Sequence, residues 1–473
     1  MSNVAKEGLL CLSWSCIQRL RIFVVTIRSR ISLLLVLLGL LQQTYPIAIM
    51  DPSSTAISGA PSNAGSKIIV CGLNPALQKR LTLQSEKSLI EGNVHRIESM
   101  SEGVGGKGQD VAVALVKSCG LLPRHLKLLQ FVGSNDDSTS TRFLELLAEK
   151  LNAQSVDENH NGGPVCTIRS DGKLRTCTTI LSRNGLEATE LVEPSCEVNE
   201  ENFERLMKCQ EDRGHVGAIC VMGSMPPGCP TDAYARLIRS TLEKNPNALC
   251  LIDSLVGLEQ IFEVLKSRSS STDRSVLKIN LAELRNLVIG KGNHRALEMI
   301  ANIKIENDIS LISVEEVETL SKAFVYAFGG MSRIGVGNLL LTNGRYPANI
   351  VNLQAIDNDR NGFRCKSISI DVPELCGKNK ALFPIGAGDA VAAGTLLAWN
   401  YLDSSRKKEK SEKKLNPLIL DFDTFLMHAL DKTSTSILPL ERAFEFGLAC
   451  GSASCLIEEN SEFLIDDVLS FLQ

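Results

Sequence analysis

Short apolar runs recur along the chain, and each is followed by a polar or turn-forming residue, which is typical of buried strands. The clearest runs cover 67–73, 126–133, 215–222, 248–253, 276–279 and 336–342. Between and beside them lie segments that predict helices, at 111–118, 141–151, 232–244, 258–268, 282–288 and 309–328. Because strands alternate with helices, the pattern predicts an α/β fold with a mostly parallel sheet covered on both faces.

Two further regions alternate apolar and polar residues and predict half-buried strands. Segments 80–83 and 94–97 are joined by a polar loop, and segment 165–182 is typical of a hairpin that turns at Asp171-Gly172. We expect these strands, near 80–100 and 165–182, to form a small sheet outside the main core.

Polar and small residues follow the predicted buried strands, at the point where each strand ends. They are Asn74, Gly223-Ser224, Asp253, Asn280 and Gly344. Ligands of parallel sheets bind beyond the carboxyl ends of the strands, so this placement gathers the candidate binding residues on one rim.

The stretch Gly386-Ala387-Gly388-Asp389 precedes an apolar, alanine-rich helix that runs to Trp399. The N-terminus of a helix offers unpaired N–H groups that suit phosphate, and Asp389 falls in its first turn. A carboxylate beside an anion cradle is what phosphoryl transfer to a hydroxyl needs. Taken alone, the stretch is more simply a capped helix start, because short motifs often arise by chance.

A second glycine-rich stretch, Gly103 to Gly108, matches the dinucleotide-binding pattern G-x-G-x-x-G. That pattern requires an acidic residue at the end of the next strand, and 128–132 contains none. The stretch also lacks the Gly-Lys-Ser/Thr ending of a P-loop. Its glycines and Lys107 can instead approach an anionic substrate, or form a tight connection from strand to helix.

Composition narrows the class of protein. The net charge of −4 gives no electrostatic reason to expect nucleic acid or an anionic membrane as a partner. Fifteen cysteines without a C-x-x-C pair argue against a disulfide framework and a zinc knuckle, and they fit a reducing intracellular compartment. We therefore expect an intracellular, soluble protein.

Residues 1–66 predict a leader and a polar linker ahead of one large domain at 67–473. The first fifty residues contain four arginines, at 19, 21, 28 and 30, and only one acid, Glu7. The apolar run at 31–41 is too short for a membrane span of ~20 residues. The segment is typical of a targeting peptide for a plastid or another organelle, or of a signal-peptide core. Alternatively, the protein starts at Met50 and stays in the cytosol.

Several of these motifs occur in an order that resembles the ribokinase-like sugar kinases of the phosphofructokinase B group. The likeness is strongest to the 1-phosphofructokinase and tagatose-6-phosphate kinase branch, and it runs from about residue 67 to the C-terminus. The matching pieces are Leu73-Asn74-Pro75-Ala76-Leu77, Gly105-Gly106-Lys107-Gly108, Leu174-Arg175-Thr176-Cys177 with Thr189-Glu190, Gly223-Ser224-Met225-Pro226-Pro227-Gly228, Lys278-Ile279-Asn280-Leu281-Ala282-Glu283-Leu284 and Gly386-Ala387-Gly388-Asp389. The resemblance implies a three-layer α/β/α fold with a small β lid.

The resemblance also implies a role for each candidate site residue. Asp389 would be the catalytic base, and the N–H groups of Gly386, Ala387 and Gly388 would form the anion hole. Asn280 and Glu283 would organise Mg²⁺ through water. The nucleotide would be held by Lys278, Asn280, Glu283, Thr342 and Gly344. The sugar would be held by Asn74, Gln78, Gly105, Gly106, Lys107 and Asp110, and its existing phosphate by Arg175 and Ser224.

Two functions follow from the resemblance. The first is an ATP- and Mg²⁺-dependent kinase that phosphorylates a hydroxyl of a ketohexose phosphate of the fructose 1-phosphate, fructose 6-phosphate or tagatose 6-phosphate type. A monovalent cation is a further candidate cofactor, and the lid is the expected contact of a homodimer. The second is a catalytically silent family member that acts as a ligand-binding or regulatory subunit. The departures Gln78, Asp110 and Pro384, where the family commonly has an acid, an asparagine and a threonine, motivate this second function.

Overall fold

The computed structural model describes residues 67–84, 89–154, 156, 163–182, 188–210, 215–268, 272–303, 312–355, 363–375, 382–408 and 439–472, without the side chains of 404–408. The predicted leader and linker, 1–66, lie outside the described residues. Within these ranges, no helix combines the length and the apolar character needed to cross a membrane.

A nine-stranded sheet forms the centre of the domain, in the order β13-β12-β11-β10-β9-β8-β1-β4-β5. Seven strands run parallel: β1 (Lys67–Cys71), β4 (Leu126–Val132), β5 (Val165–Arg169), β8 (Val216–Met222), β9 (Leu249–Asp253), β10 (Ser275–Asn280) and β11 (Asn338–Asn343). The apolar runs of the sequence form these strands because a parallel sheet buries both of its faces. The predicted α/β fold is confirmed.

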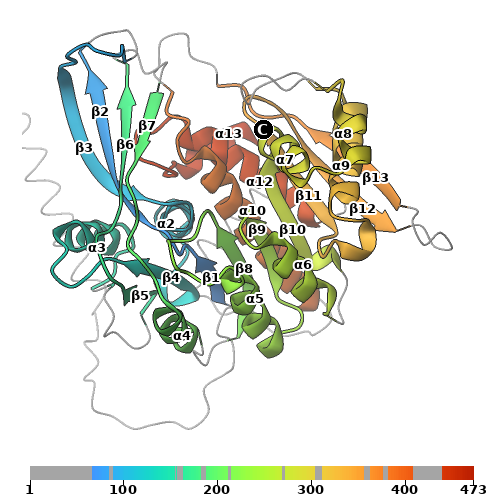
Figure 1. The fold of residues 1–473 in the computed structure, drawn as a ribbon, viewed down its shortest axis with the longest axis horizontal. Helices are drawn as coiled ribbons and strands as arrows, with labels where there is room; N and C mark the ends of the chain where they lie inside the picture. The colour runs from blue at the N-terminus through green and yellow to red at the C-terminus, as the bar shows by residue number, and fades with distance from the viewer. Residues whose placement is uncertain are drawn as a thin grey trace, which may run out of the picture. The chain divides into compact units, whose positions relative to one another are not determined.

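Helices cover both faces of this sheet, and the alternation of side chains along each strand makes two cores. On β1, Ile68 and Val70 belong to one core, and Ile69 and Cys71 belong to the other. The first core packs against α2 (Lys107–Val113), η1 (Ala114–Ser118), α3 (Ser138–Lys150), α10 (Ala387–Lys408), α12 (Pro439–Ser454) and α13 (Ile465–Phe471). The second packs against α4 (Glu200–Cys209), α5 (Ala233–Lys244), α6 (Leu258–Lys266), α7 (Leu281–Lys291), α8 (His294–Ile300) and α9 (Val314–Ala327). Figure 1 shows α5 and α6 in front of the sheet and α10 and α12 behind it.

A second sheet of four strands stands beside the first, in the order β3-β2-β6-β7 (Figure 1). Its strands are β2 (Ala76–Leu83), β3 (Ile97–Gly105), β6 (Thr176–Leu181) and β7 (Ala188–Val192). The strand expected at 94–97 begins only at Ile97, and it continues through the first part of the glycine-rich stretch to Gly105. We call these four strands the small sheet.

The predicted hairpin at 165–182 is wrong, because its two arms belong to different sheets. β5 pairs in parallel with β4 in the large sheet, and β6 pairs in parallel with β2 in the small sheet. Cys166 and Ile168 are buried in the second core, so β5 stays in the large sheet while the chain crosses to the small sheet at 170–175. Alternation reports how a strand is buried and does not identify its partner.

Other elements were not predicted from the sequence. The antiparallel strands β12 (Tyr346–Ala355) and β13 (Phe363–Ile370) extend the edge of the large sheet, and α4, α8, α12, α13 and β7 are likewise new. Three short 3₁₀ turns complete the described elements: η2 (Pro123–His125), η3 (Thr272–Arg274) and η4 (Met331–Arg333). A disulfide between Cys166 and Cys209 links β5 to α4, although most of the other described cysteines are buried thiols, as expected.

The first turn of α2 packs directly on the end of β1, and this contact requires two glycines. A Cβ on Gly108 would lie 2.8 Å from the nitrogen of Gly72 and 3.4 Å from the carbonyl carbon of Cys71. Only a residue without a Cβ lets the two backbones approach so closely. The contact places Lys107 and Asp110 of α2 at the rim of the large sheet.

We predict that Gly108→Ala lowers the free energy of unfolding in urea by about 1–3 kcal/mol, because the new methyl group overlaps the backbone of β1. Gly290→Ala is the matched control. Gly290 is an exposed residue of α7 with no atom within 4 Å of the added Cβ, so the substitution should stabilise the helix by about 0.5–1 kcal/mol. Equal stability of Gly108→Ala and the wild type would contradict the proposed contact.

Candidate active site

A cleft of about 480 Å³ lies at the carboxyl ends of β1, β8, β9 and β10. Of the residues selected from the sequence, the structure brings eleven to its lining: Asn74, Gln78, Gly106, Lys107, Asp110, Arg175, Ser224, Lys278, Glu283, Gly386 and Asp389. Six do not line it: Gly105, Asn280, Thr342, Gly344, Ala387 and Gly388. The rim predicted from the strand ends therefore forms a single concave site. Of the residues expected to bind the nucleotide, only some line this cleft.

Asp389 lies in the first turn of α10, where the sequence placed it, and only 9% of its surface is exposed. The turn before it depends on Gly386, whose φ of +83° is in the left-handed region. The carbonyl of Gly386 accepts hydrogen bonds from the N–H groups of Asp389 (3.0 Å) and Ala390 (2.9 Å) and so starts the helix. The N–H of Ala387 donates to Pro384 O at 3.2 Å, so it serves the turn itself in this state.

A buried ion-pair network adjoins Asp389. Asp253, at the end of β9, accepts one hydrogen bond from Lys107 Nζ (2.9 Å) and one from Lys278 Nζ (2.6 Å). Asp253 and Lys278 are each 5% exposed. A Cβ on Gly388 would lie 3.6 Å from Lys278 Nζ, so the ammonium group lies against the start of α10. One cation, Lys278, thus lies against the helix N-terminus, and Lys107 binds the same carboxylate of Asp253. Positive charge at a helix N-terminus suits a phosphate group.

This network sets the pKa of the catalytic candidate. Burial, and next the charge of Asp253, raise the pKa of Asp389 to about 7, while Lys107 and Lys278 oppose the rise. The two lysines hold the pKa of Asp253 below its usual range, although burial alone would raise it. Asp253 therefore remains a carboxylate at neutral pH, whereas Asp389 exchanges a proton near pH 7, as a general base should.

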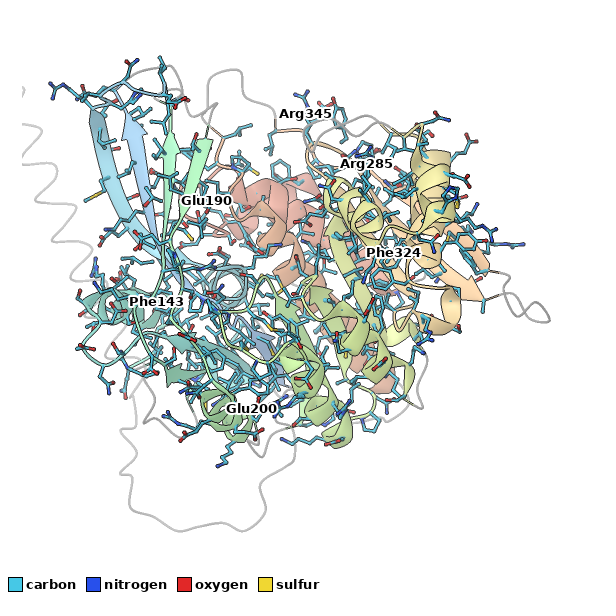
Figure 2. All side chains as sticks on the ribbon, viewed as in Figure 1. Phe143, Glu190, Glu200, Arg285, Phe324 and Arg345 are labelled. Atoms are coloured by element: carbon cyan, nitrogen blue, oxygen red, sulfur yellow. A yellow bond between two sulfur atoms is a disulfide. The ribbon has the colours of Figure 1, made fainter. Side chains whose placement is uncertain are left out.

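Asp110 occupies the first turn of α2 on the opposite side of the cleft and is 5% exposed. Burial raises its pKa well above the usual range, and the charges of Asp389, Glu190 and Glu462 raise it further. Glu190 lies on β7, the edge strand of the small sheet (Figure 2). Gln78 Nε2 donates to Thr179 Oγ1 at 2.7 Å, which fixes the amide on the face of the small sheet.

Asn74 is the centre of a polar cluster at the end of β1. Its side-chain amide donates to Ser224 Oγ (3.0 Å), and its Oδ1 accepts from Ser195 Oγ (2.7 Å). The guanidinium of Arg175 donates to Asn74 O (2.6 Å) and Pro75 O (3.2 Å). Arg175 and Ser224 thus both bond to Asn74, one through its backbone carbonyl and the other through its side-chain amide.

Asn280 and Glu283 form a capping box at the start of α7. Asn280 Oδ1 accepts from the N–H of Glu283 (2.7 Å), and a carboxylate oxygen of Glu283 accepts from the N–H of Asn280 (3.3 Å). Next to them along the same sheet edge, Thr342 of β11 is in register with Asn280, and Gly344 follows β11 with a φ of +57°. The capping box thus gives Asn280 and Glu283 a structural role at the start of α7. Glu283 also lines the cleft.

The carboxylates that line the cleft fit a hydrated Mg²⁺ better than a metal held by protein ligands alone. Within the described ranges, no group of three or more acidic, histidine or cysteine residues is suited to hold a metal directly. Mg²⁺ in phosphoryl-transfer sites typically keeps several waters and binds one or two carboxylates together with substrate phosphates. Glu283 lines the cleft on the same side as Asp253 and Asp389, so the donor chemistry fits this mode.

Sequence reasoning did not assign a role to several residues in or beside the cleft. Asp253 was placed among the rim residues by its position at the end of a strand, but its ion pairs with the two lysines could not be predicted from that position. Ser195 and Asn460 had no local signal, because they come from a loop before α4 and from the segment after α12. Glu190 was part of a matching piece, but its place in the cleft depends on the pairing of β7 with β6.

No protein-family model matches the chain. Solved structures of sugar kinases match nearly all of the domain. Phosphofructokinase-2 from Escherichia coli, in a complex with potassium, superposes with a TM-score of 0.55 at 17% identity, over 86% of this chain and 98% of that one. Ribokinase from Giardia lamblia gives a TM-score of 0.54 at 14% identity, over 85% and 98% of the two chains. A possible 1-phosphofructokinase from Thermotoga maritima gives 0.51 at 16% identity, over 86% and 97%. The chain therefore has the fold of the ribokinase-like sugar kinases, the family that its motifs resemble.

Proposed function

We propose that this protein is an ATP-dependent carbohydrate kinase that transfers the γ-phosphoryl group to a hydroxyl of a ketohexose phosphate. One observation carries the proposal. A buried carboxyl group with a pKa of about 7, Asp389, lies at a helix N-terminus in a cleft that is also lined by two lysines, the buried Lys278 and the more exposed Lys107. Few binding or structural roles require a base and an anion site at the same place.

In the proposed reaction, the ionised carboxylate of Asp389 takes the proton of the acceptor hydroxyl. The acceptor oxygen then forms a bond to the γ-phosphorus, while the bond from that phosphorus to the bridging oxygen breaks and ADP leaves. The N–H groups of Gly386, Ala387 and Gly388, with Lys278 nearby, stabilise the charge on the transferring group. The N–H groups of Gly386 and Gly388 belong to a packed helix start and need little reorganisation when the charge moves, whereas the N–H of Ala387 must first leave Pro384 O.

Glu283 and Asn280 would hold Mg²⁺ through water, and Lys278, Thr342 and Gly344 would contact the nucleotide. Bound Mg²⁺ would neutralise the charge of the phosphates and help to align them. A monovalent cation remains part of the proposal, supported by the E. coli phosphofructokinase-2 structure determined in complex with potassium.

At the acceptor end, Asn74, Gln78, Gly105, Gly106, Lys107 and Asp110 would bind the sugar hydroxyls. Arg175 and Ser224 would bind the phosphate already present on the sugar. Their shared contact with Asn74 supports this pairing. The structure of E. coli phosphofructokinase-2 in complex with fructose 6-phosphate, which has the same fold, supports a sugar phosphate as the acceptor.

The decisive assay measures ADP release by the wild-type protein with Mg²⁺-ATP over a panel of hexoses and hexose phosphates. Turnover with fructose 1-phosphate, fructose 6-phosphate or tagatose 6-phosphate supports the proposed acceptor. No turnover with any sugar, together with a stable partner protein on pull-down, would favour the silent, ligand-binding family member instead.

We predict that Asp389→Asn lowers kcat by about 10²–10⁴-fold while the Kd for ATP, measured by calorimetry, changes by no more than about threefold. The amide cannot accept the proton, but it preserves the shape of the helix start. Asp466→Asn is the control, because Asp466 is an exposed aspartate in the first turn of α13, away from the cleft. An Asp389→Asn protein with near-normal turnover would rule out the base.

A second prediction concerns pH. Asp389 must be ionised to act, so kcat/KM should fall about tenfold for each pH unit below 7. Asp253→Asn removes a negative neighbour that raises the pKa of Asp389, and it frees the two lysines that lower this pKa. The acidic limb of the pH profile should therefore move to lower pH in Asp253→Asn. A limb that stays in place or moves to higher pH would contradict the electrostatic origin of the shift.

We also infer that the chain forms a homodimer through the small sheet. Exposed apolar residues concentrate there: Ile97 and Met100 on β3, and Leu191 and Val192 on β7. Met100→Asp combined with Leu191→Asp should yield a monomer by light scattering, whereas the wild type should have twice that mass. A wild type that is monomeric at high concentration would contradict the inference.

A further inference from the structure

A loop near the C-terminus, residues 455–464, connects α12 to α13 and lies behind the turn that starts α10. The carbonyl of Cys455 accepts a hydrogen bond from the N–H of Phe383 (2.9 Å), three residues before Gly386. At its other end, the N–H of Phe463 donates to Ser118 Oγ (2.9 Å) in η1. We call this segment the C-terminal loop.

Ser461 of this loop holds the turn directly. It is completely buried, and its φ of +58° is uncommon for a residue other than glycine. Its hydroxyl donates to Gly386 O (2.8 Å), the same carbonyl that accepts from Asp389 and Ala390. A Cβ on Gly386 would lie 2.7 Å from the nitrogen of Ser461, so the two backbones are in contact. The strained backbone of Ser461 thus fixes the carbonyl from which the helix of Asp389 begins.

Arg80 of β2 reaches this loop from the small sheet. Its Nη2 donates to Asn460 Oδ1 (2.9 Å), and its Nη1 lies 3.4 Å from Glu458 Oε1. Its guanidinium carbon lies 6.0 Å from the ring centroid of Phe383. Each contact is therefore either with the C-terminal loop or with Phe383, in the segment that leads to Gly386.

Arg80 is only 8% exposed, and its Nε has no hydrogen-bond partner within the described part of the chain. Burying an arginine with an unsatisfied N–H group lowers the stability of the folded protein. Stability alone is therefore a poor explanation for the contacts that Nη1 and Nη2 make.

The position of Arg80 also links it to the acceptor end of the cleft. Arg80 and Gln78 are two residues apart on β2 and so share one face of the small sheet. A second cavity of about 180 Å³ is lined by Arg80 and shares Gln78, Asp110 and Asn460 with the main cleft. A movement of β2 that accompanies acceptor binding at Gln78 would therefore move Arg80 as well.

We propose that Arg80 is a positioning residue that transmits the position of the small sheet to the Gly386–Asp389 turn through Asn460 and Ser461. The catalytic consequence rests on the proposed kinase function, whereas the mechanical coupling does not. The anion-binding turn takes its working geometry when the small sheet is seated over the cleft, so acceptor binding and phosphoryl binding depend on each other.

The first test is kinetic. Arg80→Met should lower kcat about 10–100-fold, because a misplaced turn loses alignment with the phosphoryl group, while the KM for ATP stays within about twofold. Arg80→Lys, which retains a donor for Asn460, should recover part of the loss. The control is Arg274→Met, because Arg274 is also largely buried and donates two 2.8 Å bonds to Asp403 but does not line the cleft. A similar fall in kcat for Arg274→Met and Arg80→Met would overturn the specific role of Arg80.

The second test asks whether Arg80 and Ser461 act as one unit. Ser461→Gly keeps the positive φ and removes only the hydroxyl bond to Gly386. If the two residues belong to one chain of contacts, the double variant Arg80→Met/Ser461→Gly should be about as slow as the slower single variant. If the fold-losses of kcat in the two single variants multiply in the double variant, Arg80 and Ser461 act independently, and the proposed coupling is wrong.

The third test needs no turnover and so separates the coupling from the proposed function. Hydrogen–deuterium exchange of the backbone at 383–395 should be faster in Arg80→Met than in the wild type, and unchanged in Arg274→Met. Faster exchange in a protein that phosphorylates no sugar would support the coupling and defeat the kinase proposal. Unchanged exchange at 383–395 would overturn the coupling, whatever the activity.

Discussion

The site depends on the ion pairs that Asp253 makes with Lys107 and Lys278. Lys107 comes from α2, Asp253 from the end of β9, and Lys278 from β10, so the network ties together three elements around the cleft. Burial alone would raise the pKa of Asp253, and the two lysines instead hold it below its usual range. The lysines have no comparable carboxylate partner among the described side chains. With its charge fixed, Asp253 raises the pKa of Asp389, which lies nearby without a comparable salt bridge among the described residues. One aspartate therefore remains an anion at neutral pH, while the other titrates near neutral pH, as the proposed base requires.

The same network explains why the phosphoryl end of the cleft combines acidic and basic groups. Asp253 already holds the ammonium groups of both lysines at the cleft. A bound phosphate would share with Asp253 the neutralisation of their positive charge. The acceptor end differs, since Asp110 is buried and its pKa is raised by burial and by Asp389. The small sheet forms the outer wall of this end, and Arg80 connects it to the turn of Asp389. Side-chain contacts of Arg80 thus link the small sheet to the C-terminal loop that holds the turn.

The sequence could predict the elements whose signal is local. Buried parallel strands gave continuous apolar runs, and the helix of Asp389 followed from its alanine-rich composition. The hairpin at 165–182 was wrong because pairing depends on distant segments: β5 meets β4, and β6 meets β2. The same limit applies to the site. Residues at strand ends, such as Asn74 and Ser224, could be selected, because parallel topology brings strand ends together. Arg80 and Ser461 could not be, because Arg80 bonds Asn460, which follows it by 380 residues, and Ser461 bonds Gly386, which precedes it by 75.

The central claim is that burial, reinforced by the charge of Asp253, turns Asp389 into a base of near-neutral pKa. The most direct measurement is the titration of its side-chain carboxyl by ¹³C NMR in protein labelled at aspartate, with Asp389→Asn used to assign the signal. The structure predicts a midpoint at about pH 7 in the free protein. A midpoint near pH 4, the value of an ordinary aspartate, would contradict the account and would leave the cleft without a base suited to phosphoryl transfer.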